Sequence, residues 1–184
     1  MERVFTRINQ QAKLSQRFLV DFRASFEATS YRKWGIWISE GQLAREWLLI
    51  KEGAMVVRQQ TDVADSVAML VNPGQPVIPT HGLFLDEKSP YTYQFLEDSE
   101  VYVMDSRALA ALLLKHDDAR LLLHFLLAEQ LKRQEAHGLV LAFADPEARI
   151  AYAEANHKLP FGMLNREDQA SFLGMSKRVY QRYV

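Results

Sequence analysis

The spacing of hydrophobic positions changes along the chain and predicts successive kinds of structure. Near the start, apolar residues recur at every fourth position, at Leu14, Phe18, Phe22 and Phe26. This spacing predicts a short amphipathic helix that packs on the body. From about residue 25 to residue 105, short runs rich in β-branched and aromatic residues alternate with turn-forming residues. Many short strands at close spacing predict a small antiparallel sandwich or barrel.

The pattern becomes helical from residue 106 onward. Ser106 is a predicted N-cap, followed by one helix to Lys115 and a long one from about Asp118 to Phe143. The run 121–131 is apolar on most sides, so it needs cover from more than one neighbour. Either all of that cover lies within one monomer, or part of it is the same helix of a second copy. Because the chain has few other elements, the sequence favours a two-fold homodimer.

The C-terminal residues predict three further helices. Asp145 and Pro146 supply the N-cap and first position of a helix to about Asn156, and residues 157–162 predict a connector. Two helices joined by a tight turn follow. The small Ala170 allows a close helix crossing, and Gly174 supplies the left-handed backbone that such a turn requires.

Cationic residues follow this turn. Ser176 is placed to cap the second helix, on which we expect Lys177, Arg178 and Arg182, with Val179 and Tyr183 facing the body. Cations near the start of the second helix are typical of a DNA-binding helix-turn-helix. The alternative is an ordinary helical hairpin with a solvated basic face.

The charge distribution supports a local nucleic-acid surface only. The formal net charge is -1, but residues 157–184 hold five Lys or Arg and two acids, a local +3 against -4 for the remainder. The absence of cysteine excludes disulfides and cysteine-zinc sites. The N-terminus lacks an apolar signal core, and charges interrupt the most apolar stretch, 108–131, so we expect no membrane span and a cytoplasmic location.

Three stretches, in this order, resemble a known family. Residues 31–41 combine a basic pair with Gly, apolar residues and Glu-Gly, and residues 47–57 place Gly53 between two apolar runs. With the segment 164–178, they make the chain similar to the Crp/Fnr transcription regulators, most of all to the short members common in Bacteroidetes. The resemblance implies an α+β fold with three regions. These are an antiparallel β-roll (double-stranded β-helix) effector domain at 1–117, a dimerisation helix at 118–143, and a helix-turn-helix domain at 144–184.

The resemblance also implies a function. The chain would be a dimeric transcription regulator that binds double-stranded DNA and works with RNA polymerase. Its DNA-binding residues would be Ser176, Lys177, Arg178 and Arg182. Gln169 departs from the family, which usually has an apolar residue there, so either looser packing or entry of solvent is expected at that position. The other interpretation is a β-roll module that binds a ligand or a protein without binding DNA.

The effector region also departs from the family. Cyclic-nucleotide binders of this fold hold the ribose with an acid and the phosphate with an Arg, positions that here fall on Thr80 and on Ser89 or Pro90. No arginine occurs between Arg58 and Arg107. We therefore expect no response to cAMP or cGMP. A small effector of another kind, apolar or mixed, would bind in an aromatic pocket formed by Trp34, Trp47, Thr80, His81, Gly82, Tyr91 and Tyr93. The alternative is that most of these aromatic residues belong to the core.

Enzymatic chemistry has no support in the sequence. The five histidines are scattered, and the chain has neither a phosphate-binding loop nor a nucleophile motif. We expect no catalytic residues, no cofactor and no metal.

Overall fold

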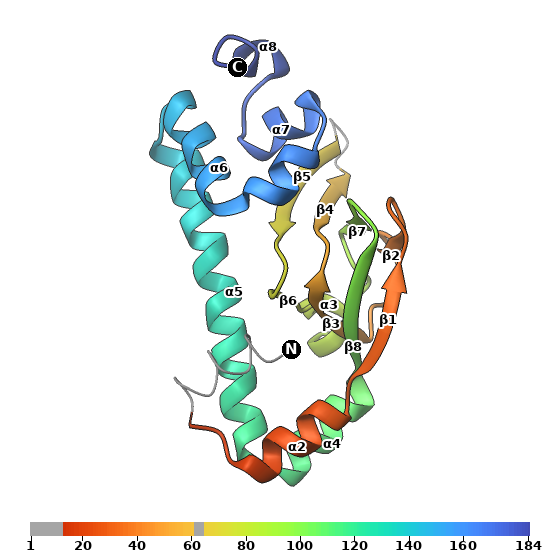
Figure 1. Ribbon diagram of the computed structural model, residues 1–184. Helices are drawn as coiled ribbons and strands as arrows, with labels where there is room; N and C mark the ends of the chain where they lie inside the picture. The colour runs from red at the N-terminus through yellow and green to blue at the C-terminus, as the bar shows by residue number, and fades with distance from the viewer. Residues whose placement is uncertain (1–12, 61–64) are drawn as a thin grey trace.

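The computed structural model describes residues 13–60 and 65–184 and has the mixed α+β architecture that the sequence predicts (Figure 1). Its β-part consists of two four-stranded antiparallel sheets, with strand orders β1-β8-β3-β6 and β2-β7-β4-β5. The strands are β1 (Glu27–Tyr31), β2 (Ile36–Ile38), β3 (Glu46–Glu52), β4 (Met55–Gln60), β5 (Asp65–Val71), β6 (Pro76–Val77), β7 (Thr92–Phe95) and β8 (Ser99–Asp105). Apolar side chains from both sheets, including Leu48, Met55 and Phe95, fill the space between them.

Helices flank the β-roll at both ends and along one side (Figure 1). Their bounds are α2 (Gln16–Ala24), α3 (Thr80–Phe84), α4 (Ser106–Lys115), α5 (Asp117–Phe143), α6 (Pro146–Met163), α7 (Arg166–Phe172) and α8 (Lys177–Tyr180). The predicted long helix is therefore confirmed within one residue at its start. In Figure 1, α5 runs from α2 and α4 at one end of the molecule to α6 at the other.

The N-terminal helix packs as its four-residue spacing predicts. Phe18 and Phe22 are fully or nearly fully buried, and Phe26 packs against the same cluster. Trp47 of β3 joins them, with its ring 6.1 Å from that of Phe22. This cluster fixes α2, α4 and the first half of α5 to one end of the β-roll.

The structure corrects two helix boundaries. Asp105, and not Ser106, caps α4, because its carboxylate accepts from the amide of Ala108. The helix predicted to end near Asn156 does break there, because His157 is non-helical (φ -134°, ψ 26°), but most of the predicted connector 157–162 is helical, so that α6 extends across the kink to Met163. Pro160 has no amide hydrogen to give to the Asn156 carbonyl, and the side chain of Asn72 donates to that carbonyl instead, at 3.0 Å. The kink thus replaces the predicted connector.

Candidate nucleic-acid interface

The last two helices are joined by the tight turn that the sequence predicts. Gly174 has φ +62°, in the left-handed region, and the amide of Met175 donates to the carbonyl of Ala170 at 3.1 Å. Ala170 is buried, as its small size at the crossing predicts. Asn165 caps α7, and the Ser176 side chain caps α8 by accepting from the amide of Val179. The backbone therefore has helix-turn-helix geometry.

The predicted DNA-binding cations lie on the surface, but not all of them lie on α8. Lys177 and Arg178 form the first turn of α8 and are exposed. The prediction that Arg182 lies on this helix was wrong, because α8 ends at Tyr180. Beyond that point the amides of Arg182 and Tyr183 donate to the carbonyls of Val179 and Tyr180, three residues earlier, and not four as in an α-helix. Arg182 is thus presented by a tight terminal turn next to α8.

Val179 and Tyr183 were both predicted to face the body of the protein, and this prediction was wrong for Tyr183. Tyr183 is exposed, and Tyr180 instead packs inward beside Val179. The Tyr180 hydroxyl donates to Oε1 of Gln169 at 2.9 Å, while Nε2 of Gln169 donates to the carbonyl of Phe161. Gln169, which is partly exposed, therefore joins α6, α7 and α8 through hydrogen bonds.

Arg149 holds this unit from α6, a role that no sequence pattern indicates. Its Nε donates to the carbonyl of Ala144, just after α5, and its Nη1 donates to the carbonyls of Leu173 and Gly174 in the turn. One guanidinium thus connects the end of the long helix with the turn before α8. An arginine on a helix surface looks solvated in a sequence, so only the folded structure identifies these carbonyls as its partners.

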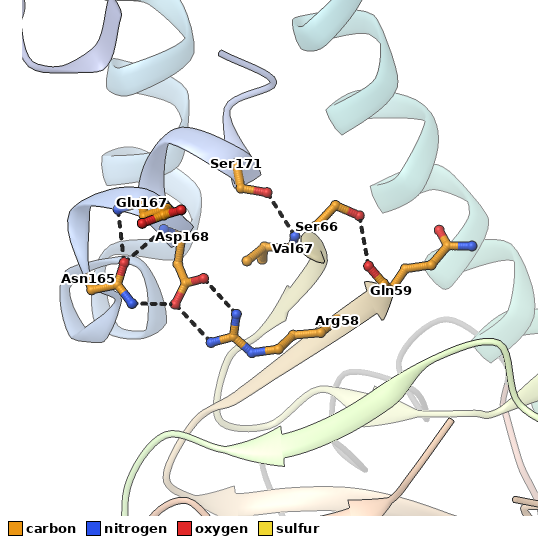
Figure 2. Close-up of polar contacts among 8 residues, drawn as sticks. All are labelled: Arg58, Gln59, Ser66, Val67, Asn165, Glu167, Asp168 and Ser171. Carbon is orange, nitrogen blue, oxygen red and sulfur yellow. Dashed lines mark hydrogen bonds and ion pairs between the residues drawn. The ribbon is translucent and has the colours of Figure 1, made fainter. Parts of the chain in front are cut away.

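The opposite side of the unit docks on the β-roll. Asp168 of α7 receives two hydrogen bonds from the guanidinium of Arg58 on β4, and Ser171 accepts from the amide of Val67 on β5 (Figure 2). We call Arg58, Val67, Asp168 and Ser171 the docking contacts. Between the elements lies an apolar cluster that includes Val67, Leu70, Phe161, Phe172 and Leu173.

Two histidines lie where the β-roll, α5 and α6 meet. His137 stacks on Phe172, with ring centroids 4.3 Å apart, and its Nε2 lies 3.0 Å from the Phe172 carbonyl. Burial, followed by the nearby charges of His137 and Arg133, lowers the pKa of His157 to about 4. Burial also lowers the pKa of His137. Both rings are therefore neutral at pH 7, and they line a cavity of about 30 Å³.

The predicted effector residues fall in three places. His81, Tyr91 and Tyr93 come together, with ring centroids 6.0 Å apart for His81 and Tyr91 and 6.5 Å for the two tyrosines. Trp47 lies apart in the cluster around α2, and Trp34 is half exposed in the β1–β2 turn with φ +65°. Thr80 and Gly82 flank His81 on α3 and so belong to the first of these places. Thr80 begins this helix, and Gly82 packs so closely that a Cβ there would lie 2.0 Å from the carbonyl oxygen of Ala44.

Residues 13–60 and 65–184 contain neither a candidate metal site nor a candidate membrane-spanning helix. No group of three or more His, Cys, Asp or Glu side chains in these segments could hold a metal ion. None of the helices described has the length and apolar character to cross a bilayer.

No family model matches the chain. No curated protein matches it either. Solved structures do match, at low sequence identity. CLP of Xanthomonas campestris, a c-di-GMP responsive global regulator, is 18% identical with a TM-score of 0.70, covering 92% of this chain and 89% of its own. FixK2 from Bradyrhizobium japonicum is 19% identical with a TM-score of 0.72, covering 86% and 82%. The catabolite activator protein of Thermus thermophilus is 18% identical with a TM-score of 0.60, covering 96% and 84%. The chain therefore has the fold of these regulators over nearly its whole length.

Proposed function

We propose that this protein is a dimeric, DNA-binding transcription regulator of the Crp/Fnr type. The proposal rests on one observation. The chain ends in a helix-turn-helix that exposes cations, and the long helix α5 connects this unit with the β-roll. CLP is a global regulator and FixK2 shares the same fold, which supports the same role here. We also propose that the chain belongs with the short members of this family that are common in Bacteroidetes.

DNA would be read by the surface that includes the start of α8. Lys177 and Arg178 lie in the first turn of α8, where cations meet the major groove in helix-turn-helix proteins. Ser176 caps this turn and would also contact a phosphate, while Arg182 would reach the duplex from the following turn. Arg can bridge both acceptors of guanine, whereas Lys gives a single point-charge contact.

The dimer would form along α5. One stripe of exposed or half-exposed residues runs along this helix, and the step from each residue to the next is alternately four and three positions. The stripe consists of Leu121, Phe125, Ala128, Lys132, Glu135, Leu139 and Ala142. Alternation of four and three is the seam of a two-stranded coiled coil. Within the described residues, the side chains of Leu121 and Leu139 are 49% and 60% exposed. A second copy of α5 would bury them.

The β-roll would not hold a cyclic nucleotide. Ser89, at the expected cation position, uses its hydroxyl on the backbone of Tyr91, and Lys88, the only Lys or Arg between Arg58 and Arg107, is exposed. An effector of another kind would contact His81, Tyr91 and Tyr93, whose rings lie together. Calorimetric titration with cAMP and cGMP should give no heat at millimolar ligand. Saturable binding tighter than about 100 μM, roughly -5.5 kcal/mol, would overturn this part of the proposal.

The main test is selection of duplex DNA from a random pool by the purified protein. We expect enrichment of a two-fold symmetric site with half-sites one helical turn apart. The double variant Lys177→Glu, Arg178→Glu should lose binding, while Arg107→Glu, an exposed cation on α4, should retain it. Failure to enrich any symmetric site would favour the alternative of a β-roll ligand or protein-interaction module.

A further inference from the structure

A bidentate ion pair between Arg58 and Asp168 joins the β-roll to the helix-turn-helix. Nη1 lies 2.6 Å from Oδ1 and Nη2 lies 2.8 Å from Oδ2, and the side chains are only 22% and 17% exposed (Figure 2). Two parallel bonds between planar groups fix an angle as well as a distance. Asn165 also donates to Oδ2 at 2.9 Å, which holds the carboxylate in place.

A local irregularity in the sheet lies beside Arg58. The register of β4 and β5 shifts there, since Val57 pairs with Met69 whereas Arg58 pairs with Val67. Such a bulge re-aims side chains on a strand. In Figure 2 the Arg58 side chain points from the sheet toward α7.

A second bond lies close by. The amide of Val67 donates to Oγ of Ser171 at 3.0 Å. This amide is available because β5 is the last strand of its sheet. Asp168 and Ser171 are three residues apart, so they share one face of α7. Two polar contacts on one helix face fix the rotation of that helix on the sheet.

The covalent connection alone does not fix this rotation. The helix-turn-helix follows α6, which is bent at His157, and Pro160 interrupts the hydrogen-bond ladder of the same helix. The bend is a joint in the chain, fixed on its near side by the bond from Asn72 to the Asn156 carbonyl. The docking contacts lie beyond this joint and connect α7 directly with the β-roll.

We propose that strands β4 and β5 set the orientation in which the helix-turn-helix meets DNA, with Arg58 and Ser171 as positioning residues. The inference rests on the proposed DNA-binding function. In a dimer the angle of each reading unit decides how far apart the two half-sites must lie. The docking contacts therefore set the preferred half-site spacing without touching DNA.

The first experiment measures affinity for selected half-sites separated by spacers that differ in steps of one base pair. The wild type should prefer one spacing. In Arg58→Gln we expect the ratio between the best and the next-best spacing to fall about five- to tenfold, within the usual range of coupling between sites. Affinity for a single half-site should stay within about twofold, as expected for a change away from the DNA contacts. The charge-reversed pair Arg58→Asp, Asp168→Arg should restore part of the spacing preference.

The matched control is Lys51→Gln, which removes an ion pair with Glu100 on the β-roll and leaves the docking contacts intact. Its spacing preference should equal that of the wild type. An unchanged preference in Arg58→Gln would overturn the proposal. Equal losses at all spacings and at single half-sites would also overturn it, because they would indicate a purely structural role. If the wild type binds no DNA, the proposed function fails instead.

A second experiment needs no DNA. The chain has no cysteine, so Thr29→Cys on β1 and Gln181→Cys after α8 can carry spin labels at two exposed positions. Labelled chains are diluted with unlabelled ones, so that distances within one chain dominate. We expect one narrow distance distribution in the wild type and a broad one when Arg58→Gln is added. Equally narrow distributions in both would overturn the role of Arg58.

Discussion

The C-terminal helices have an inner face toward the β-roll and an outer face toward solvent, and two neighbouring acids show how these faces differ. Asp168 faces inward and binds Arg58, which lies 110 positions away in the sequence. Glu167 faces outward and lies 3.6 Å from Lys177, an exposed cation only ten positions away. Contacts of the first kind are partly shielded from water and geometrically defined, whereas exposed pairs contribute little to stability. The inner face therefore determines orientation, and the outer face is available for a partner.

The largest expected effect comes from the apolar centre of the inner face. Phe172 is 1% exposed and contacts His137, His157 and Phe161. Phe172→Ala should lower the free energy of unfolding by about 3–5 kcal/mol, because it leaves a cavity. Chemical denaturation measures this change. A loss below about 1 kcal/mol would mean that the inner face is loosely packed.

If α5 forms the proposed dimer, a charge on its outer side should separate the subunits without unfolding them. Leu139→Glu should convert the dimer to a monomer at micromolar concentration in sedimentation, because it places two acids in the seam. The control is Leu114→Glu on α4, where the leucine is 87% exposed and lies off the seam. Leu126, in the middle of the apolar run, is unsuitable because it is buried within the monomer. A monomeric wild type would contradict the dimer.

On the proposed DNA-facing surface, the two kinds of cation should behave differently. Arg182→Ala should cost about 1–3 kcal/mol of binding and relax preference at one base pair, whereas Lys177→Ala should weaken all sequences equally and reduce the salt slope by about one. Fluorescence anisotropy at several salt concentrations distinguishes these outcomes. Neither variant should change the free energy of unfolding by more than about 0.5 kcal/mol. If Arg182→Ala weakens all sequences equally, Arg182 contacts phosphate only.

The smallest effect concerns pH and again belongs to the inner side. The pKa of His157 is lowered to about 4 in the folded protein from an ordinary 6.5. Between these values the unfolded chain binds more protons, so the free energy of unfolding should fall as pH falls from 6.5 to 4. Because His157 is only half-buried, solvent reduces the effect to about 1 kcal/mol. His157→Gln should flatten this part of the profile, whereas the exposed His124→Gln should not.

Sequence patterns predicted what depends on local spacing. The four-residue repeat of α2, the extent of α5, the left-handed Gly174 and the Ser176 cap are each decided by neighbouring residues, and the structure confirms them. The end of α8 was missed because the change to three-residue hydrogen bonds after Tyr180 has no signature in residue type. Arg182 therefore lies beyond the end of the helix on which it was predicted.

The inner face escaped prediction for a different reason. Arg58 and Asp168 meet only because a bulge in β4 and β5 coincides with the placement of α7, and no local pattern encodes this. Single charged residues in a strand and in a first helical turn are ordinary surface features. Their partnership follows from tertiary structure alone. The same holds for Arg149, whose partners are backbone carbonyls that any residue would supply.

Arg149 has a consequence for how the protein opens locally. Its guanidinium binds the carbonyl that follows α5 and two carbonyls in the turn before α8. Local opening of the turn removes two of the three carbonyls that hold this guanidinium, and so weakens its hold on the end of the long helix as well. Segments coupled in this way exchange their amide hydrogens as one cooperative unit. The last turn of α5 and the turn at Gly174 should accordingly share one protection level, although about thirty residues separate them in the sequence.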